Sequence, residues 1–124
     1  MDDAHRILVV DDELGPREAL RMILKSKYHV LTAVNGPDAL QVLSNTPPDI
    51  VLLDIKMREM NGIEVLRAIK ETDTSIEVIM MTAHASLQTA RDAMTHGASE
   101  YLLKPFSKRE VEEAIEKALK RRAE

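Results

Sequence analysis

Five short apolar segments alternate with longer amphipathic segments, and this alternation constrains the fold more than any other feature of the sequence. The apolar segments are rich in β-branched residues and lie at residues 7–10, 29–34, 50–53, 76–81 and 100–103. Amphipathic segments follow them at residues 14–26, 36–45, 62–71, 85–96 and 107–121. Short, almost continuously apolar segments are typical of strands that are buried on both faces. The alternation therefore predicts an α/β fold, a five-stranded parallel sheet with helices on both faces.

The last amphipathic segment shows the clearest helical pattern. Its apolar residues follow the spacing i, i+3, i+4, i+7, i+8, which forms one stripe along a helix: Val111, Ala114, Ile115, Ala118 and Leu119. Ser107 and Glu110 have the spacing of a capping box, so we expect the helix to begin there.

Composition limits the classes of protein to consider. A length of 124 residues suits one domain, so we expect residues 1–124 to form a single domain. The net charge of −4 argues against nucleic-acid binding, and the absence of cysteine excludes disulfides and thiolate metal sites. No apolar run approaches the ~20 residues that span a bilayer, and no signal peptide is recognisable. We therefore expect a soluble, cytoplasmic domain without membrane contact.

Polar residues stand at the carboxyl ends of four of the five predicted strands. Asp11 and Asp12 follow the first strand, Asp54 follows the third, Thr82 follows the fourth and Lys104 follows the fifth. The second strand ends without a reactive side chain, which suits a place at the edge of the sheet. Because ligands of parallel α/β sheets bind at the carboxyl ends of the strands, these residues are candidates for one site.

Each of these residues also has a purely structural interpretation. Asp12 or Glu13 would suit the cap of the first helix, and Thr82 the cap of the fourth. Asp54 would suit the start of a solvated loop, and Lys104 an ordinary surface position. Four such coincidences at one edge of a sheet favour the functional interpretation.

The residue types indicate metal-assisted phosphoryl transfer. Carboxylates without nearby histidine or cysteine favour a hard cation such as Mg²⁺, which would also relieve their mutual repulsion. The adjacent Asp11 and Asp12 suit metal binding, which leaves Asp54 as the candidate nucleophile for an aspartyl-phosphate. Lys104 and Thr82 would then contact phosphoryl oxygens.

Four motifs together resemble the response-regulator receiver domain of two-component signalling. They are ILVVDDE (7–13), IVLLDIKM (50–57), MMTA (80–83) and YLLKPF (101–106), and the resemblance covers essentially the whole chain. It implies a flavodoxin-like, doubly wound sheet with strand order 2-1-3-4-5. Residues 82–106 look most like receivers attached to transcriptional regulators of the nitrogen-regulator type.

The resemblance also implies a reaction and a metal site. Asp54 would accept a phosphoryl group from a phosphohistidine on a sensor histidine kinase. Mg²⁺ or Mn²⁺ would be bound directly by Asp12 and Asp54, through water by Asp11, and by the backbone carbonyl of Lys56.

A switch accompanies this site in the family. The hydroxyl of Thr82 would move towards the phosphoryl group while the ring of Tyr101 turns inward. Lys104 would bind a phosphoryl oxygen, and the Lys104–Pro105 peptide bond would be cis. The alternative for Tyr101 is a buried strand aromatic that does not move.

One residue departs from the family pattern. Arg58 stands where the family usually has proline, which fixes φ and removes a hydrogen-bond donor. We expect Arg58 to alter the loop after Asp54 or kinase docking without abolishing phosphorylation. Lys56 and His84 lie two positions beyond Asp54 and Thr82, where side chains would tune the access of hydrolytic water.

The expected output is regulatory, without turnover of a substrate. Phosphorylation would change the face formed by the fourth helix, fifth strand and fifth helix, and so control homodimerisation or an effector domain. One alternative is a small metal-dependent phosphatase with an aspartyl nucleophile. Lys56 occupies the place of its second acid, although Glu13 lies two residues beyond Asp11. A second alternative is a receiver-like interaction module that never takes up phosphate.

Overall fold

The structure is a computed structural model that describes residues 4–57, 60–83 and 86–123. Five parallel strands form one sheet in the order β2-β1-β3-β4-β5. In chain order the strands are β1 (Arg6–Val10), β2 (His29–Ala33), β3 (Ile50–Asp54), β4 (Glu77–Thr82) and β5 (Glu100–Leu103). The helices are α1 (Leu14–Leu24), α2 (Gly36–Asn45), α3 (Gly62–Thr72), α4 (Leu87–Thr95) and α5 (Lys108–Ala123). The predicted fold class and strand order are confirmed.

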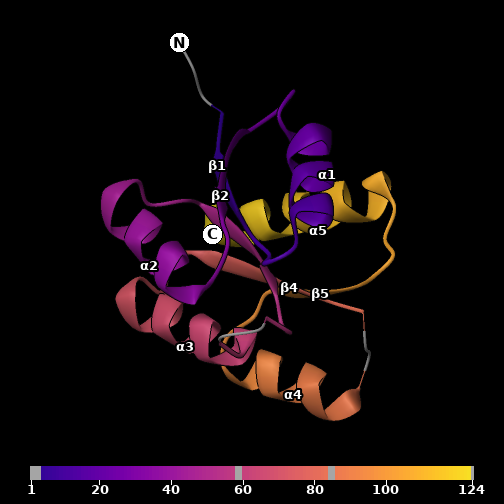
Figure 1. Ribbon diagram of the computed structural model, residues 1–124. Helices are drawn as coiled ribbons and strands as arrows, with labels where there is room; N and C mark the ends of the chain where they lie inside the picture. Colours follow the sequence, from indigo (N-terminus) through magenta and orange to yellow (C-terminus); the bar gives the residue numbers. More distant parts are fainter. Residues whose placement is uncertain (1–3, 58–59, 84–85, 124) are drawn as a thin grey trace.

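The sheet separates two apolar cores because successive side chains of a strand point to opposite faces. In β3, Val51 and Leu53 pack under α2, α3 and α4, whereas Ile50 and Leu52 pack under α1 and α5. Figure 1 shows the same division, with α1 and α5 on one side of the sheet and α2, α3 and α4 on the other. Every residue of β3 is buried, as the apolar segment predicts for a central strand.

Side-chain caps fix where several helices begin. The predicted capping box is confirmed at α5, where Ser107 N–H donates to Glu110 Oε1 (2.9 Å) and Glu110 N–H donates to Ser107 Oγ (3.1 Å). Asn61 Oδ1 accepts from Ile63 N–H at the start of α3 (2.8 Å), and Ser86 Oγ accepts from Thr89 N–H at the start of α4 (3.0 Å). The hydroxyl of Ser86 therefore caps α4, and the interpretation of Thr82 as that cap is wrong.

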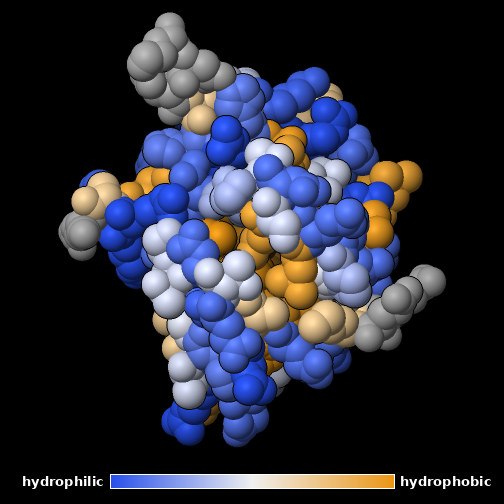
Figure 2. Space-filling model, turned by 90° about the vertical axis from the view of Figure 1, so that its left-hand side faces the viewer, coloured by the Kyte–Doolittle hydropathy of each residue, from blue (hydrophilic) through white to orange (hydrophobic). Residues whose placement is uncertain are grey.

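On the side where α2 and α3 lie, apolar residues gather in the middle of the surface and hydrophilic residues surround them (Figure 2). The core on this side includes half-buried apolar side chains, among them Leu31, Leu40 and Ile63. Among the helices of the described residues, none combines the length and apolar character needed to cross a lipid bilayer.

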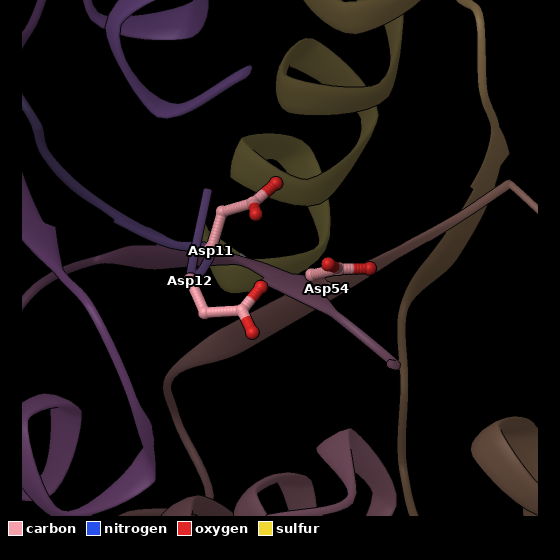
Figure 3. Close-up of side chains that lie close together, drawn as sticks. All are labelled: Asp11, Asp12 and Asp54. Carbon is pink, nitrogen blue, oxygen red and sulfur yellow. The ribbon is translucent and has the colours of Figure 1, made fainter. Parts of the chain in front are cut away.

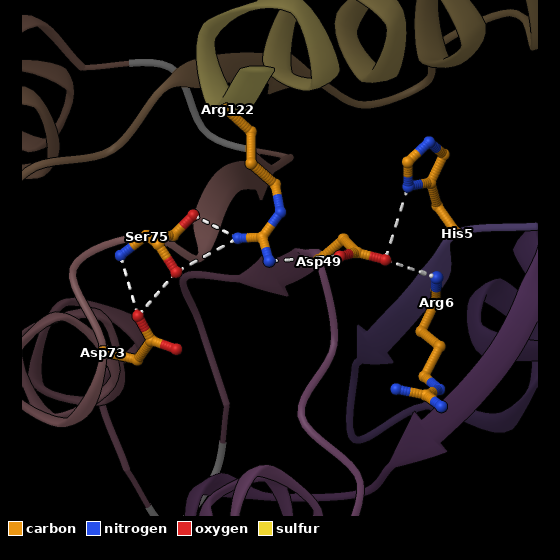
Figure 4. A network of polar contacts seen from close by, with 6 residues as sticks. All are labelled: His5, Arg6, Asp49, Asp73, Ser75 and Arg122. Carbon is orange, nitrogen blue, oxygen red and sulfur yellow. Dashed lines mark hydrogen bonds and ion pairs between the residues drawn. The ribbon is translucent and has the colours of Figure 1, made fainter. Parts of the chain in front are cut away.

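A polar network fastens the last turn of α5 to the end of the sheet where the strands begin (Figure 4). Arg122 donates to the backbone carbonyl and the hydroxyl of Ser75, and its Nη2 lies 3.1 Å from Asp49 Oδ1. The other oxygen of Asp49 accepts from Arg6 N–H (2.9 Å) and lies 3.5 Å from His5 Nδ1. Asp49 thereby links α5 to the first residue of β1.

Candidate functional site

The alternation of the strands brings Asp11 and Asp54 to the same side of the sheet. Asp11 continues β1, because its N–H donates to Ala33 of β2 (3.2 Å), and Asp54 is the last residue of β3. Asp11 lies two positions after Val9, and Asp54 lies two positions after Leu52. Val9 and Leu52 both pack under α1 and α5, so alternation places the two aspartates on that face of the sheet. Figure 3 shows Asp11 and Asp12 beside Asp54, and one carboxylate oxygen from each lies within 4.8 Å of the others.

Asp11 is completely buried and is held at several atoms. Its Oδ1 accepts from Glu13 N–H (3.0 Å) and its Oδ2 accepts from Lys104 Nζ (3.0 Å). Its backbone carbonyl accepts from Arg17 Nη1 on α1 (2.9 Å). Glu13 occupies the N-cap position of α1 but makes no side-chain cap hydrogen bond, so its interpretation as a capping side chain is wrong.

The ammonium group of Lys104 contacts both Asp11, which follows β1, and Asp54, which ends β3. Lys104 comes directly after β5, yet its ammonium reaches Asp11 at 3.0 Å and Asp54 Oδ2 at 3.7 Å. Its backbone is tied to β4, because Lys104 N–H donates to the carbonyl of Thr82 (2.7 Å). The Lys104–Pro105 peptide bond is cis, as the family resemblance implies.

Burial raises the pKa of Asp54 from 3.8 to about 6. The Lys104 ammonium opposes this rise, the Asp11 carboxylate adds to it, and the Lys56 N–H again lowers the pKa. Only 5% of the Asp54 surface is exposed, so loss of hydration outweighs the neighbouring carboxylates as the cause. With this pKa the carboxylate is mostly ionised at neutral pH, and a cation bound to it would favour the ionised form further.

Thr82 and Tyr101 belong to β4 and β5, the two strands on the side of β3 opposite to β1. Thr82 is the last residue of β4 and is buried, one position beyond Met81, which pairs with Asp54. Tyr101 of β5 is half-buried, and its hydroxyl lies 3.5 Å from Thr89 Oγ1 on α4. The ring of Tyr101 packs against the core that α2, α3 and α4 cover.

Comparison with known proteins identifies the family to which this arrangement belongs. The model of the family described as "Response regulator receiver domain" matches residues 7–116. The chain belongs to this family. It is therefore a receiver domain, and a phosphoacceptor role follows from that membership.

Individual relatives agree with the assignment. The receiver domain is 39% identical over 115 residues to sporulation initiation phosphotransferase F of Bacillus subtilis, covering 92% of this chain and 93% of that protein. It is similar to a receiver domain protein of Methanospirillum hungatei in structure, with a TM-score of 0.93, 30% identity and 98% of both chains covered. It is also 40% identical over 114 residues to the transcriptional regulatory protein ZraR of Salmonella typhimurium. That match covers 91% of this chain but only 26% of ZraR.

The loop after Asp54 returns close to the backbone of β3. Gly62 N–H donates to the carbonyl of Ile55 (2.7 Å). A Cβ atom at Gly62 would lie 2.5 Å from the Asp54 carbonyl oxygen and 2.6 Å from Ile55 Cα. Glycine is required there because the first turn of α3 packs directly on the backbone that carries the candidate nucleophile.

An open hollow of about 240 Å³ lies at the site of this receiver domain. Its lining residues lie at or shortly after the carboxyl ends of β1, β3, β4 and β5, and include Pro16 in the first turn of α1: Glu13, Pro16, Asp54, Lys56, Ala83 and Lys104. Lys56 therefore borders the same hollow as Asp54. Arg58 and His84, the other two residues expected to tune the reaction, lie outside the described residues.

Arg17 was not among the residues expected from the sequence. Its guanidinium reaches the loop between β1 and α1 through a hydrogen bond to a backbone atom, and such contacts leave no periodic pattern in a sequence. The only available signal is an arginine near the start of the helix that follows Asp11 and Asp12.

Proposed function

We propose that Asp54 accepts a phosphoryl group from a phosphohistidine of a sensor histidine kinase. The observation that carries this proposal is the cluster of Asp11, Asp12 and Asp54, in which one carboxylate oxygen of each residue lies within 4.8 Å of the others. Lys104 adds the positive charge that a transferred phosphoryl group requires, 3.7 Å from Asp54. Receiver-family membership supplies the donor class.

Mg²⁺ or Mn²⁺ fits this cluster because every donor is a carboxylate oxygen, which a hard cation prefers. Asp12 and Asp54 would bind the ion directly, and the Lys56 carbonyl would add a further oxygen. Both carboxylate oxygens of Asp11 already accept hydrogen bonds, which supports its assignment to an indirect contact through water. When bound, the ion would neutralise negative charge of the carboxylates and of the phosphoryl oxygens.

The reaction forms one bond and breaks one. An ionised Asp54 oxygen bonds to phosphorus while the phosphorus–nitrogen bond of the donor breaks, and the imidazole leaves with the electron pair. Lys104 offsets charge on the phosphoryl oxygens, and the Thr82 hydroxyl donates a hydrogen bond to one of them. Lys56 and His84 tune how fast water removes the phosphoryl group, measurable as the half-life of the phosphorylated protein. Arg58 alters the loop after Asp54 or kinase docking without abolishing phosphorylation.

Phosphorylation changes the conformation of one face of the protein. The protein acts as a regulator and does not turn over a substrate. Movement of Thr82 and Tyr101 transmits phosphorylation to the face of α4, β5 and α5. Three large apolar side chains are exposed on α4 and β5, namely Leu87, Met94 and Leu103. They support this face as the contact for a second copy or for an effector domain of the ZraR kind.

The alternatives receive less support. A phosphatase with an aspartyl nucleophile is disfavoured by Lys56, which stands two residues beyond Asp54 where such an enzyme carries an acid. An inert interaction module would not need three carboxylates, a buried Thr82 and Lys104 at one edge of the sheet.

Beryllofluoride with Mg²⁺ tests the proposal, because it mimics a phosphoryl group bound to aspartate. We expect NMR signals near Asp54, Thr82 and Tyr101 to shift in the wild-type protein. The Asp54→Asn variant, which keeps the shape of the side chain but lacks the ionised oxygen, should show no such shift and should take no phosphate from a phosphorylated kinase. An unchanged wild-type spectrum at saturating Mg²⁺ and beryllofluoride would favour the inert module.

A further inference from the structure

The side chain of Arg17 holds the peptide unit between Asp11 and Asp12. Arg17, on the second turn of α1, donates from Nη1 to the Asp11 carbonyl oxygen at 2.9 Å. Asp11 is completely buried, so this carbonyl cannot turn to bulk water if the guanidinium is removed. Arg17 itself is half-buried, and its backbone N–H donates to the carbonyl of Glu13, which ties the same turn to the loop (3.3 Å).

The held peptide unit carries both adjacent carboxylates of the cluster. A peptide unit is planar and runs from one Cα atom to the next, here from Asp11 to Asp12. The orientation of this plane therefore sets the position of the Asp12 Cα atom and the direction in which the Asp12 side chain faces Asp54. The side chain of Asp11 is fixed separately by Glu13 N–H and Lys104. Rotation of the peptide plane would also displace Asp12, the residue assigned to direct metal contact.

We propose that Arg17 is a positioning residue for metal binding. Its hydrogen bond fixes the Asp11–Asp12 peptide unit, so that the Asp12 carboxylate is oriented for the ion before the ion arrives. This inference rests on the proposed phosphoacceptor function with its bound Mg²⁺. It assigns to α1 a task within the site, beyond covering one face of the sheet.

The charge of Arg17 and its hydrogen bond have opposite effects on metal affinity. A cation near three carboxylates repels Mg²⁺, so removal of its charge alone would tighten metal binding. Loss of the hydrogen bond would free the peptide plane and weaken metal binding, as loss of groups that orient metal ligands generally does. The sign of the change therefore separates a positioning role from a nearby charge.

Arg17→Met is the test variant, because it keeps most of the aliphatic stem and removes every donor. We expect its Mg²⁺ dissociation constant, measured by NMR titration without phosphodonor, to rise ~10-fold. Arg17→Lys retains a charged donor and should bind Mg²⁺ more tightly than Arg17→Met. The ¹⁵N shift of the Asp12 amide in the metal-free protein should change in Arg17→Met, because it reports the hydrogen bond on the preceding carbonyl.

Arg21→Met is the matched control. Arg21 lies on the next turn of α1, where its guanidinium pairs with Glu18 at 2.9 Å, and its replacement removes the same charge from the same helix. We expect its Mg²⁺ affinity and its Asp12 amide signal to stay as in the wild type. Thermal unfolding of all variants shows whether each remains folded at the titration temperature, and Arg17→Lys keeps the test available if Arg17→Met is unstable.

The outcomes are distinct. Unchanged or tighter Mg²⁺ binding by Arg17→Met overturns the inference, and so does an unchanged Asp12 amide signal. If the wild-type protein itself binds no Mg²⁺, the proposed function fails instead, whatever the variants show. Weaker binding by Arg17→Met with recovery in Arg17→Lys supports the inference.

Discussion

Asp54 combines burial with a carboxylate that has to be ionised to react. The residue is 5% exposed, and burial raises its pKa to about 6. A carboxyl group with a raised pKa in the folded protein stabilises that protein only while it is protonated. Without metal, its contribution is complete below its ordinary pKa of 3.8 and is lost as the pH rises through about 6.

The Asp54→Asn variant should lack the change of stability with pH that Asp54 causes, because an amide stays neutral at every pH. We expect the metal-free variant to be more stable than the wild type at pH 7 by ~2 kcal/mol, after allowance for screening by solvent. The difference should shrink as the pH falls from 7 to 4. Urea unfolding of both proteins across this range measures it, and a difference that does not change with pH would contradict the burial of an ionised carboxylate.

The sequence predicts which residues meet at the site better than it predicts how they pair. The ends of β1, β3 and β5 bring Asp11, Asp54 and Lys104 together, because the carboxyl ends of parallel strands share one edge. Lys104 was expected to serve the phosphoryl group, yet its shorter contact is with Asp11. Such pairing depends on side-chain reach and on burial, which strand order alone does not determine.

At the scale of elements, the start of α3 is the most tightly constrained junction of the site. Asn61 caps the helix, and Gly62 lies against the backbone of Asp54 and Ile55. The atoms that a side chain at Gly62 would strike belong to the backbone, so they cannot move aside as a flexible side chain does.

Gly62→Ala should therefore destabilise the fold by ~2–3 kcal/mol and displace Asp54. Gly15→Ala provides the control, because Gly15 lies near the start of α1 and a Cβ atom there meets nothing within 4 Å. We expect Gly15→Ala to unfold at the same or a slightly higher temperature than the wild type. Equal stability of the two variants in thermal unfolding would rule out the close approach at Gly62.

The limits of the elements show where sequence patterns lose precision. The segment predicted as a helix over residues 14–26 ends at Leu24, and the last helix extends to Ala123 instead of residue 121. Amphipathic spacing identifies the buried face of a helix, but its end depends on local hydrogen bonds such as Lys25 N–H to the Arg21 carbonyl (2.9 Å). The caps at Ser107 and Asn61 fall within a residue of the predicted starts because cap chemistry is local.

At the scale of the whole molecule, the carboxylate cluster and the Arg122 network lie at opposite ends of the sheet. Asp49 precedes β3 and Asp54 ends it, so the strand separates the Arg122 network from the carboxylate cluster. The guanidinium of Arg122 joins α5 to the loops before β3 and β4. Its side chain is 28% exposed, which leaves this ion pair less screened than a fully exposed one.

Arg122→Gln should loosen the last turn of α5 and lower the free energy of unfolding by ~1–2 kcal/mol. Amide hydrogen exchange in that turn should become faster, while Mg²⁺ affinity at the other end stays as in the wild type. Arg109→Gln is the comparison, because Arg109 pairs with Glu113 on the same helix but is 86% exposed, and its loss should change stability by less than ~0.5 kcal/mol. Equal effects of the two substitutions would remove the structural role assigned to Arg122.

The register of β3 limits where insertions and deletions can occur in a gene that encodes this domain. The strand pairs with β1 on one side and β4 on the other, with Val51 opposite both Leu8 and Val78. A single codon inserted or deleted within β3 would turn every later side chain of the strand to the opposite face of the sheet. Asp54 would then point under α2, α3 and α4, away from Lys104. We therefore expect changes of length to be tolerated in the loops but not between Ile50 and Asp54.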